Sequence, residues 1–509
     1  MTSARHDEVF LENARLGARS DVLIEFEEKA QFSRLHRLCD SYTLVDLAHV
    51  VMLIETGILS RKRGARLLTG LLHLNGMDAK SFPWLDNSNS YLVHAEQWLG
   101  RELGEDIAGL LQTGRSRNDQ DAAAERLFQR DLLIRLGAAL LDLLDGVLDQ
   151  AEAHADTLMP GYTHFQHAQP WTFGHYLMRQ ASILSRDVAR LADAYPRTNL
   201  SALGGAANAG TSWPIDRRRT AELLGHDGIV VNSCDAGEFA RDHIEETTAC
   251  LAILASDLGR FATDLYVWHS FEFGYVEVAD SLAGTSSIMP QKKNPHSLER
   301  VKSIGGQATG WLATVMGCQR PAFSTDLDFT FADDLFGRFA EVTYGALRLM
   351  DETVRTLTVN RERMAANADA YWSTTSHLAD ELVRVHDISF RSAHQIVAVF
   401  VRRAIEAGLT PRTVQAKHLA HAAHETAGIT TTFSDDKLRE TLDGRHFVET
   451  RRSEGSVAPY QVRKHAAALR AELSERRRLF VSLQNSIESA VAQLLGIART
   501  LAQFGDGRK

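Results

Sequence analysis

The placement of proline constrains the fold of this chain more than any other feature. Only ten prolines occur in 509 residues, and none lies between Pro83 and Pro160 or between Pro214 and Pro290. Because proline breaks the interior of a helix, long stretches without it leave room for very long helices. The chain is therefore expected to be built from helices that run well beyond the usual three turns.

Apolar spacing within the first of these stretches supports the same conclusion. Leucine or valine recurs in alternating steps of three and four at positions 133, 136, 140, 143 and 147. This spacing predicts an apolar seam along a helix from about residue 121 to 156, as in helix bundles. Further helices are expected over 171–194, within 238–273 and after Pro295, whereas 228–232 gives the best of few strand signals. The predicted fold class is all-α, with a central bundle of long helices.

The helical pattern shortens near Asn360. Short amphipathic helices are expected over 376–386 and 392–407, and Gly408 and Pro411 then break the chain. We therefore predict three helical domains. They are an N-terminal domain over 1–114, a central bundle over 115–367 and a smaller C-terminal domain over 368–509.

Composition excludes several functional classes. No run approaches the roughly 20 apolar residues of a membrane span, and the first residues lack the apolar core of a secretory signal. Four widely spaced cysteines without a Cys-x-x-Cys pair indicate a reducing cytoplasm rather than a disulfide framework or structural zinc. A formal net charge of −9 argues against nucleic acid as a partner. An anionic ligand would need cations concentrated at its own site.

Three polar, cationic segments interrupt the long helices, and the first is TGRSRNDQ at 113–120. Arg115 and Arg117 offer forked donors suited to carboxylates, and Asn118 adds an amide. Asn118 or Asp119 is also a candidate cap for the following helix. Taken alone, the segment fits a helix start with solvated arginines as well as it fits a ligand site.

The second segment, PGYTHFQHAQP at 160–170, places Thr163 and His164 in a short turn between two long helices. A lone histidine in a turn is more often a surface residue than a catalyst. His164 and His167 together raise the question of a metal site. No Asp, Glu or Cys accompanies them at ligand spacing, so we expect no metal here.

The third segment, GTSSIMPQKKNP at 284–295, joins small hydroxyl residues to two lysines just before a helix start. Serine is a weak base unless its alkoxide is stabilised. Lys292, Lys293 and the amides entering the helix after Pro295 are suited to stabilise that charge. A disordered surface loop would not explain such large polar side chains beside a helix start.

These motifs resemble those of the fumarase/aspartase superfamily, and within it argininosuccinate lyase and the delta-crystallins. The third segment is similar to the superfamily's signature loop, and the first two look like the argininosuccinate lyase forms of its other regions. The segments at 209–225 (AGTSWPIDRRRTAELLG) and near the C-terminus (SVAPYQVRKHAAALRAEL) resemble the same branch. The resemblance extends from about residue 90 to 475.

The resemblance implies an all-α fold of three domains, in which four chains pack their central helices into one tetrameric core. Each active site would take its three segments from three subunits of the homotetramer. The implied reaction eliminates an amine from a small anionic N-substituted aspartate and releases fumarate. It uses no metal or organic cofactor.

The resemblance also implies roles for individual residues. Ser286 matches the general base, and His164 matches a proposed acid or relay whose carboxylate partner is Glu299. Residues expected to bind the succinyl group or to line the site are Asn118, Thr163, Lys292, Asn294, Arg115, Arg117, Ser287 and Met289.

The chain departs from argininosuccinate lyase where the amine is bound. By this resemblance, Phe323, Asp328 and Phe331 stand where argininosuccinate lyase has a tyrosine, a glutamine and a lysine. Asp328 is suited to attract a cationic secondary amine, so an aminopolycarboxylate such as ethylenediamine-disuccinate is a candidate substrate. True argininosuccinate lyase activity stays open as the alternative. A weakly active structural role of the delta-crystallin kind is disfavoured, because Ser286 and Lys292 are retained.

Overall fold

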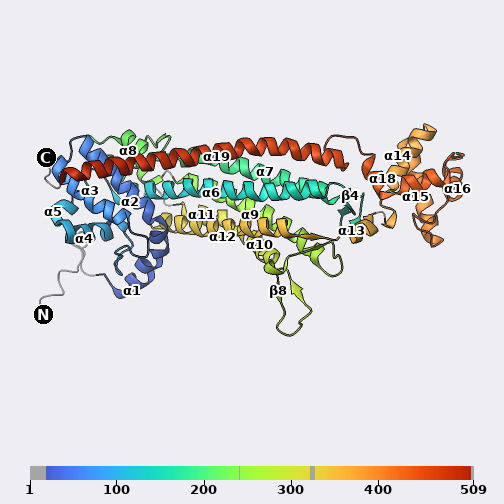
Figure 1. Ribbon diagram of the computed structural model, residues 1–509, viewed down its shortest axis with the longest axis horizontal. Coiled ribbons are helices and arrows are strands. Elements are labelled where there is room, and N and C mark those ends of the chain that lie inside the picture. The colour runs from blue at the N-terminus through green and yellow to red at the C-terminus, as the bar shows by residue number, and fades with distance from the viewer. Residues whose placement is uncertain (1–18, 240, 321–326, 369, 506–509) are drawn as a thin grey trace.

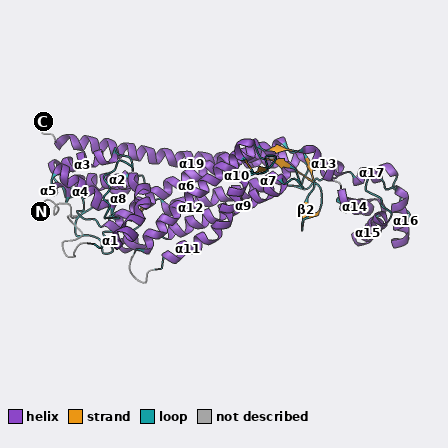
Figure 2. Cartoon of the chain, turned by 90° about the horizontal axis from the view of Figure 1, so that it is seen from below, coloured by secondary structure: helices purple, strands orange, loops and turns teal. Residues whose placement is uncertain are grey.

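The computed structural model describes residues 19–239, 241–320, 327–368 and 370–505 of the chain. It is an elongated, predominantly helical molecule, with long parallel and antiparallel helices between two clusters of shorter ones (Figures 1 and 2). The predicted all-α class is confirmed. Among the described helices, none is both long enough and apolar enough to cross a membrane.

The N-terminal end of the molecule is a compact group of helices around the almost fully buried α2 (Phe32–Glu55). Its remaining elements are α1 (Asp21–Leu23), η1 (Ile24–Glu28), η2 (Lys29–Gln31), α3 (Arg61–Asn75), α4 (Tyr91–Leu103) and α5 (Glu105–Ala108). Their apolar side chains form one core with Leu494 and Ala498 from the far end of the sequence. The last turns of α19 therefore pack against the first helices of the chain at one end of the molecule (Figure 1).

The central bundle is built around α6 (Arg117–Ala153), which packs against α7 (Phe173–Thr198), α12 (Asp328–Thr356) and α19 (Pro459–Ala502). The predicted apolar seam of α6 is fully buried at all five positions. Burial of one leucine side chain contributes about 1.5–3 kcal/mol, so this seam is a major part of the core. The bundle is completed by α8 (Arg217–Leu223), η3 (Asp235–Phe239), α9 (Asp242–His269), α10 (His296–Gln307), η5 (Ala308–Gly310) and α11 (Trp311–Cys318).

Two predicted boundaries in the bundle differ from those observed. The second long helix, α7, runs through Pro196 and ends at Thr198. A proline so close to the helix end removes only one late hydrogen bond, and the buried Ala194 and Tyr195 hold this turn in place. The predicted strand over 228–232 is reduced to β6 (Gly228–Ile229), which pairs in parallel with β5 (Leu200–Ser201).

The other described strands are equally short. They form antiparallel two-residue pairs between β1 (Leu158–Met159) and β4 (Trp171–Thr172), β2 (Tyr162–Thr163) and β3 (Gln166–His167), β7 (Val276–Glu277) and β10 (Thr358–Val359), and β8 (Gly284–Thr285) and β9 (Lys293–Asn294). They shape the turns between helices and contribute no sheet to the core.

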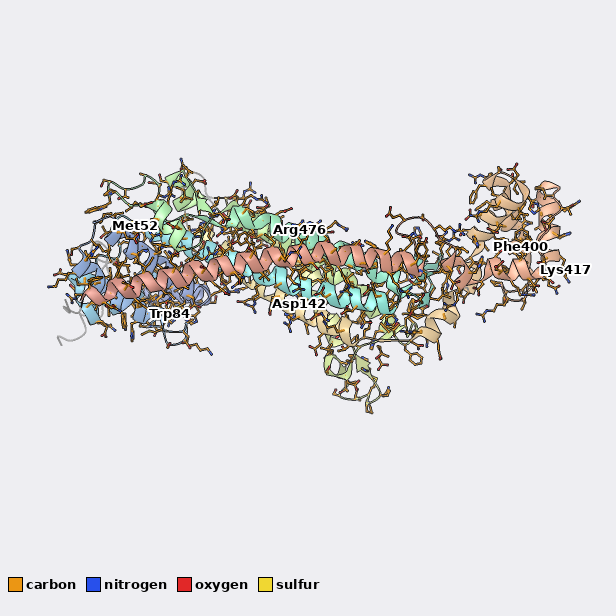
Figure 3. The ribbon with its side chains drawn as sticks, turned by 45° about the horizontal axis from the view of Figure 1, so that its top comes forward. Met52, Trp84, Asp142, Phe400, Lys417 and Arg476 are labelled. Carbon is orange, nitrogen blue, oxygen red and sulfur yellow. The ribbon has the colours of Figure 1, made fainter. Side chains whose placement is uncertain are left out.

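The smaller cluster at the other end contains both short helices predicted for it. They are α14 (Thr375–His386) and α15 (Phe390–Glu406), and the predicted inward residues Ala393, Ile396, Val397 and Phe400 are buried (Figure 3). The neighbouring elements are α13 (Arg361–Ala368), η6 (Ala370–Trp372), α16 (Ala416–Ala427), α17 (Asp435–Leu442) and α18 (Gly444–Glu449), and η7 (Gln503–Gly505) follows α19.

The last long helix, α19, leaves this cluster and returns along the bundle, antiparallel to α6. Ion pairs recur every seventh residue, from Arg463 to Asp156, from Arg470 to Asp149 (2.6 Å) and from Arg477 to Asp145 (2.8 Å). The side chains of α19 that face α6 enter the bundle core. The packing therefore differs from the expectation that 368–509 forms one domain, and we propose that the C-terminal domain ends near residue 458.

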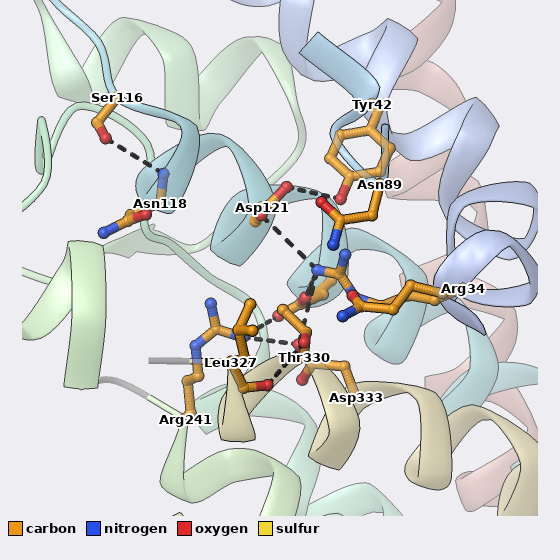
Figure 4. A network of polar contacts seen from close by, with 12 residues as sticks. Arg34, Tyr42, Asn89, Ser116, Asn118, Asp121, Arg241, Leu327, Thr330 and Asp333 are labelled. Carbon is orange, nitrogen blue, oxygen red and sulfur yellow. Dashed lines mark hydrogen bonds and ion pairs between the residues drawn. The ribbon is translucent and has the colours of Figure 1, made fainter. Parts of the chain in front are cut away.

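A buried ion cluster joins the N-terminal helices to the bundle (Figure 4). Arg34 of α2 pairs with Glu125 of α6, and Arg241 pairs with both Glu125 and Asp333 of α12, the latter at 2.7 Å. All four side chains are at most 6% exposed. Because buried charges are tolerated only when paired, this cluster fixes how the starts of α6 and α12 lie against α2.

This cluster predicts a large stability effect from a single substitution. Glu125→Ala should lower the free energy of unfolding by about 3–5 kcal/mol, because it removes the carboxylate that both buried guanidinium groups share and leaves Arg34 only more distant acidic partners, Asp333 at 3.8 Å and Asp121 at 3.9 Å. Urea unfolding at fixed protein concentration measures the effect. Arg477→Ala, which removes the exposed ion pairs to Asp142 and Asp145, is the control and should cost less than about 1 kcal/mol. Equal losses for the two variants would contradict the role assigned to the cluster.

Candidate active site

The first polar segment forms the start of α6. Ser116 is the helix N-cap, and its hydroxyl accepts a hydrogen bond from the Asn118 N–H (3.3 Å). The Asp119 carboxylate accepts from the Ser116 N–H (2.8 Å) and from the Gly204 N–H (2.7 Å). The predicted cap at Asn118 or Asp119 is therefore wrong, since Ser116 caps the helix, and Asp119 takes part as the third helical residue of a capping box. The Asn118 side chain is half-buried at the outer face of this turn (Figure 4).

Arg115 has a different place from the one expected of a ligand-binding side chain. Its guanidinium is fully buried and pairs with Asp46 of α2 at 2.7 Å. Gln120 donates to the same carboxylate oxygen at 2.7 Å. Burial raises the pKa of Asp46, and the Arg115 charge opposes that shift. Arg115 therefore holds this segment against α2, whereas the half-buried Arg117 begins the helix, and a contact of Arg115 with a ligand stays a prediction.

The second segment is a tight hairpin between β2 and β3. Thr163 pairs with Gln166, so His164 and Phe165 form a two-residue turn. Both turn residues have positive φ, 54° and 58°. This is the geometry of a type I′ turn, which normally favours asparagine and glycine. The turn holds Thr163 and His164 exposed to solvent.

The third segment is a loop that projects from the side of the bundle near β8 (Figure 1). Its stem is the β8–β9 pair, in which Thr285 lies opposite Lys293. The Lys293 ammonium pairs with Asp280 (2.6 Å) and Glu277 (2.7 Å), and these hydrogen bonds raise the pKa of Lys293. Lys293 therefore holds the stem, while Lys292 is exposed on the loop.

Ser286 lies at the start of the projecting loop and is itself a hydrogen-bond acceptor. Its Oγ accepts from the backbone N–H groups of Met289 (3.1 Å) and Ile288 (3.3 Å). Two N–H donors aimed at one hydroxyl oxygen stabilise negative charge on it. Ser287 and Met289 are exposed on the same loop, and Asn294 is half-buried in its stem.

Within one chain these segments lie far apart. Asn118 is in the first turn of α6 and Thr163 follows its other end, and the 37 residues of α6 span about 55 Å. Glu299 is in the first turn of α10, on an element separate from the His164 hairpin. The chain alone does not assemble the predicted residues into one pocket.

The residues expected near the amine begin α12. Asp328 is exposed at the first position of this helix, and Phe331 is 43% exposed one turn on. Phe323 lies outside the described residues. The ion cluster of Figure 4 holds the start of α12 next to the start of α6, so Asp328 and Asn118 share one end of the bundle.

Sequence reasoning missed Asp46, the partner of Arg115. The available signal was a lone carboxylate within the largely apolar stretch 44–54, since an ionised side chain is retained in a buried helix only with a partner. The sequence did not indicate that the partner of Asp46 is Arg115, which lies 69 positions away.

Comparison with known proteins supports the resemblance to argininosuccinate lyase. A family model described as Lyase matches residues 86–310, and one described as Argininosuccinate lyase C-terminal matches 372–449. The chain is 35% identical to argininosuccinate lyase of Methanosarcina barkeri, covering 97% of this chain and 99% of that protein. Argininosuccinate lyase of Methanocaldococcus jannaschii is 37% identical, with 84% and 87% covered.

Among solved structures, EDDS lyase in complex with formate is 34% identical and superimposes with a TM-score of 0.83, covering 97% of this chain and 98% of that chain. An EDDS lyase variant with bound fumarate has the same identity and coverage and a TM-score of 0.84. The chain thus matches two kinds of lyase about equally well over nearly its whole length. It belongs to the argininosuccinate lyase branch of the fumarase/aspartase superfamily and is a carbon–nitrogen lyase of the fumarate-forming kind.

Proposed function

We propose that this protein eliminates an amine from an N-substituted aspartate and releases fumarate, and that the amine is not arginine. The observation that carries the reaction is the environment of the Ser286 hydroxyl. Its Oγ lies on an exposed loop and accepts two backbone N–H bonds. The function further rests on membership of the family and on the residues retained in the three segments.

The reaction begins with removal of the Cβ proton of the succinyl group by Ser286. The resulting carbanion spreads its charge onto the adjacent carboxylate, which needs cations and donors aimed at it. The electron pair then forms the carbon–carbon double bond as the C–N bond breaks. The nitrogen leaves with that bond's electrons, and a proton supplied through His164 balances its charge when the substrate nitrogen is neutral.

Lys292, Asn294, Asn118 and Thr163 are proposed to hold the two succinyl carboxylates. Lys292 is the better candidate cation of the lysine pair, because Lys293 is engaged by two carboxylates in the stem. The loop from Gly284 would close over bound substrate and exclude water, bringing Ser286 and Lys292 in together. The chemistry requires no metal or organic cofactor.

Assembly into a homotetramer is proposed because one chain keeps the three segments apart. An antiparallel neighbour would place the start of its α6 beside the hairpin that follows the end of this chain's α6. A third chain would supply the loop. Each site would then take its residues from three subunits.

The amine is proposed from the departures at Asp328 and Phe331, together with the match to EDDS lyase. A second candidate, cleavage of argininosuccinate to arginine and fumarate, is favoured by the 35–37% identity to two argininosuccinate lyases. The four free cysteines support a cytoplasmic location.

Ser286→Ala tests the proposed base. We expect kcat for fumarate formation, followed by ultraviolet absorbance, to fall by several orders of magnitude while the unfolding free energy changes by less than about 0.5 kcal/mol. Ser303→Ala, at an exposed serine of α10, is the matched control and should keep wild-type kcat. Near-normal turnover of Ser286→Ala would rule out the assignment.

Mixing two inactive variants tests the shared site. When Ser286→Ala and His164→Asn chains are unfolded together and reassembled, some sites will carry neither substitution. Activity should therefore return to a fraction of the wild-type value. If mixed tetramers form, as shown by native mass spectrometry, and no activity returns, the sites are not shared.

Steady-state kinetics test the amine. Each lost hydrogen bond to a charged group is worth roughly 1.5–3 kcal/mol. Loss of two such bonds lowers kcat/KM for argininosuccinate by about two to four orders of magnitude. Ethylenediamine-disuccinate should be the better substrate. A kcat/KM for argininosuccinate near ~10⁴ M⁻¹s⁻¹ that exceeds every alternative would establish the second candidate instead.

A further inference from the structure

A cleft of about 540 Å³ opens beside the hairpin that carries His164. Its walls come from three separate parts of the chain. The hairpin supplies Tyr162, Phe165 and His167, the segment after α9 supplies Glu272 and Phe273, and the end of α13 and the following turn supply Asn367 and Tyr371. None of the roles assigned above uses this cleft.

The aromatic rings in the cleft form one continuous edge-to-face series. Tyr371 lies 5.0 Å from His167, His167 lies 5.1 Å from Tyr162, and Tyr162 lies 5.9 Å from Phe273, with interplanar angles of 67–74°. Such packing fixes the rings relative to one another. The packed rings therefore give the cleft walls of defined shape.

Hydrogen bonds fix the floor of the cleft. The Tyr162 and Tyr275 hydroxyls lie 2.7 Å apart, and the Asn367 amide donates to the Tyr275 hydroxyl at 3.1 Å. The polar ends of these tyrosines are thus engaged with one another. Because Tyr275 is 1% exposed, the ring of the half-buried Tyr162 is the part of this pair that can meet a ligand.

Backbone strain is concentrated around this cleft. Of the seven described non-glycine residues with positive φ, Phe165 and Tyr371 line the cleft, and His164 and Trp372 are their neighbours in the sequence. This conformation costs on the order of 1–3 kcal/mol at each such residue and persists at sites where a side chain must be held in place. Phe165 is 75% exposed and Tyr371 is 78% exposed, so core packing does not account for either one.

The charged side chains at the cleft indicate whether it binds a cation or an anion. Glu272 is exposed and is the carboxylate among the lining residues. Arg363 is nearby, but its guanidinium donates to the backbone carbonyls of Phe271 (3.1 Å) and Glu272 (2.7 Å). Aromatic faces together with one carboxylate attract an organic ammonium group.

We propose that this cleft binds a positively charged group on the leaving amine, at the position remote from the bond that breaks. The inference rests on the proposed lyase function, since Phe165 directly follows the candidate acid His164. A substrate whose reacting nitrogen lies at His164 then extends its second ammonium group between Phe165, Tyr371 and Glu272. The preferred amine is accordingly a diamine.

The reverse reaction tests this with two amines of equal size, ethylenediamine and n-propylamine. Addition to fumarate by the wild-type protein should show a lower KM for ethylenediamine. Phe165→Ala, Tyr371→Ala and Glu272→Gln should each raise that KM about five- to thirtyfold. The KM for fumarate and the KM for n-propylamine should change by less than about twofold.

Phe271→Ala is the matched control, because Phe271 is 89% exposed beside Glu272 and does not line the cleft. It should leave the KM for both amines unchanged. Equal rises in KM for the two amines, or a rise in the KM for fumarate, would overturn the proposal. So would a change in oligomeric state by sedimentation without a change in amine KM, since the cleft would then be a subunit contact.

Binding without turnover separates this proposal from the proposed function. The methyl NMR signal of tetramethylammonium chloride should broaden with the wild-type protein and sharpen with the Phe165→Ala/Tyr371→Ala variant. Broadening without fumarate chemistry for any amine would reject the lyase assignment and keep the cation site. Absence of broadening, together with equal turnover of both amines, would reject the cation site and keep the lyase assignment.

Discussion

The rigid length of α6 is the constraint on which the rest of this structure depends. Its 37 residues separate the segment that begins it from the hairpin that follows it by about 55 Å. The buried leucine seam packs the helix against its neighbours along that span. Residues suited to one reaction are therefore held at opposite ends of the monomer. We therefore propose that a single chain of this shape gains a complete site only from its neighbours.

Each end of the bundle holds its polar residues by a different physical means. At the start of α6, buried charge does so: Arg115 pairs with Asp46, and the capping box fixes the first turn. At the hairpin, backbone strain and ring packing hold His164 and Phe165 outward. The projecting loop has only the short β8–β9 stem, tied by Lys293 to two acids. The most weakly held of the three segments is thus the one proposed to move.

The sequence predicts the parts of this structure that depend on local pattern. The proline-free stretches and the seam at 133–147 locate α6, and the helices after Pro170 and Pro295 follow from the same reasoning. The path of α19 depends on contacts with α6 more than 300 positions earlier, so no local signal locates it. The buried role of Arg115 likewise depends on Asp46. The type I′ turn was not predictable, because His164 and Phe165 are poor residues for it.

The difference between local sequence pattern and contacts between distant segments also explains why the substrate is harder to infer than the reaction. In the proposed reaction, chemistry at the succinyl group depends on short motifs whose residues stand together in the sequence, such as Ser286, Lys292 and Asn294. Recognition of the amine is proposed to depend on surfaces assembled from distant segments, among them Asp328 on α12 and the aromatic cleft around Tyr371. Such surfaces can change by substitutions that leave the motifs intact. A retained signature loop therefore specifies how the C–N bond is broken, and the assembled surfaces specify which amine leaves.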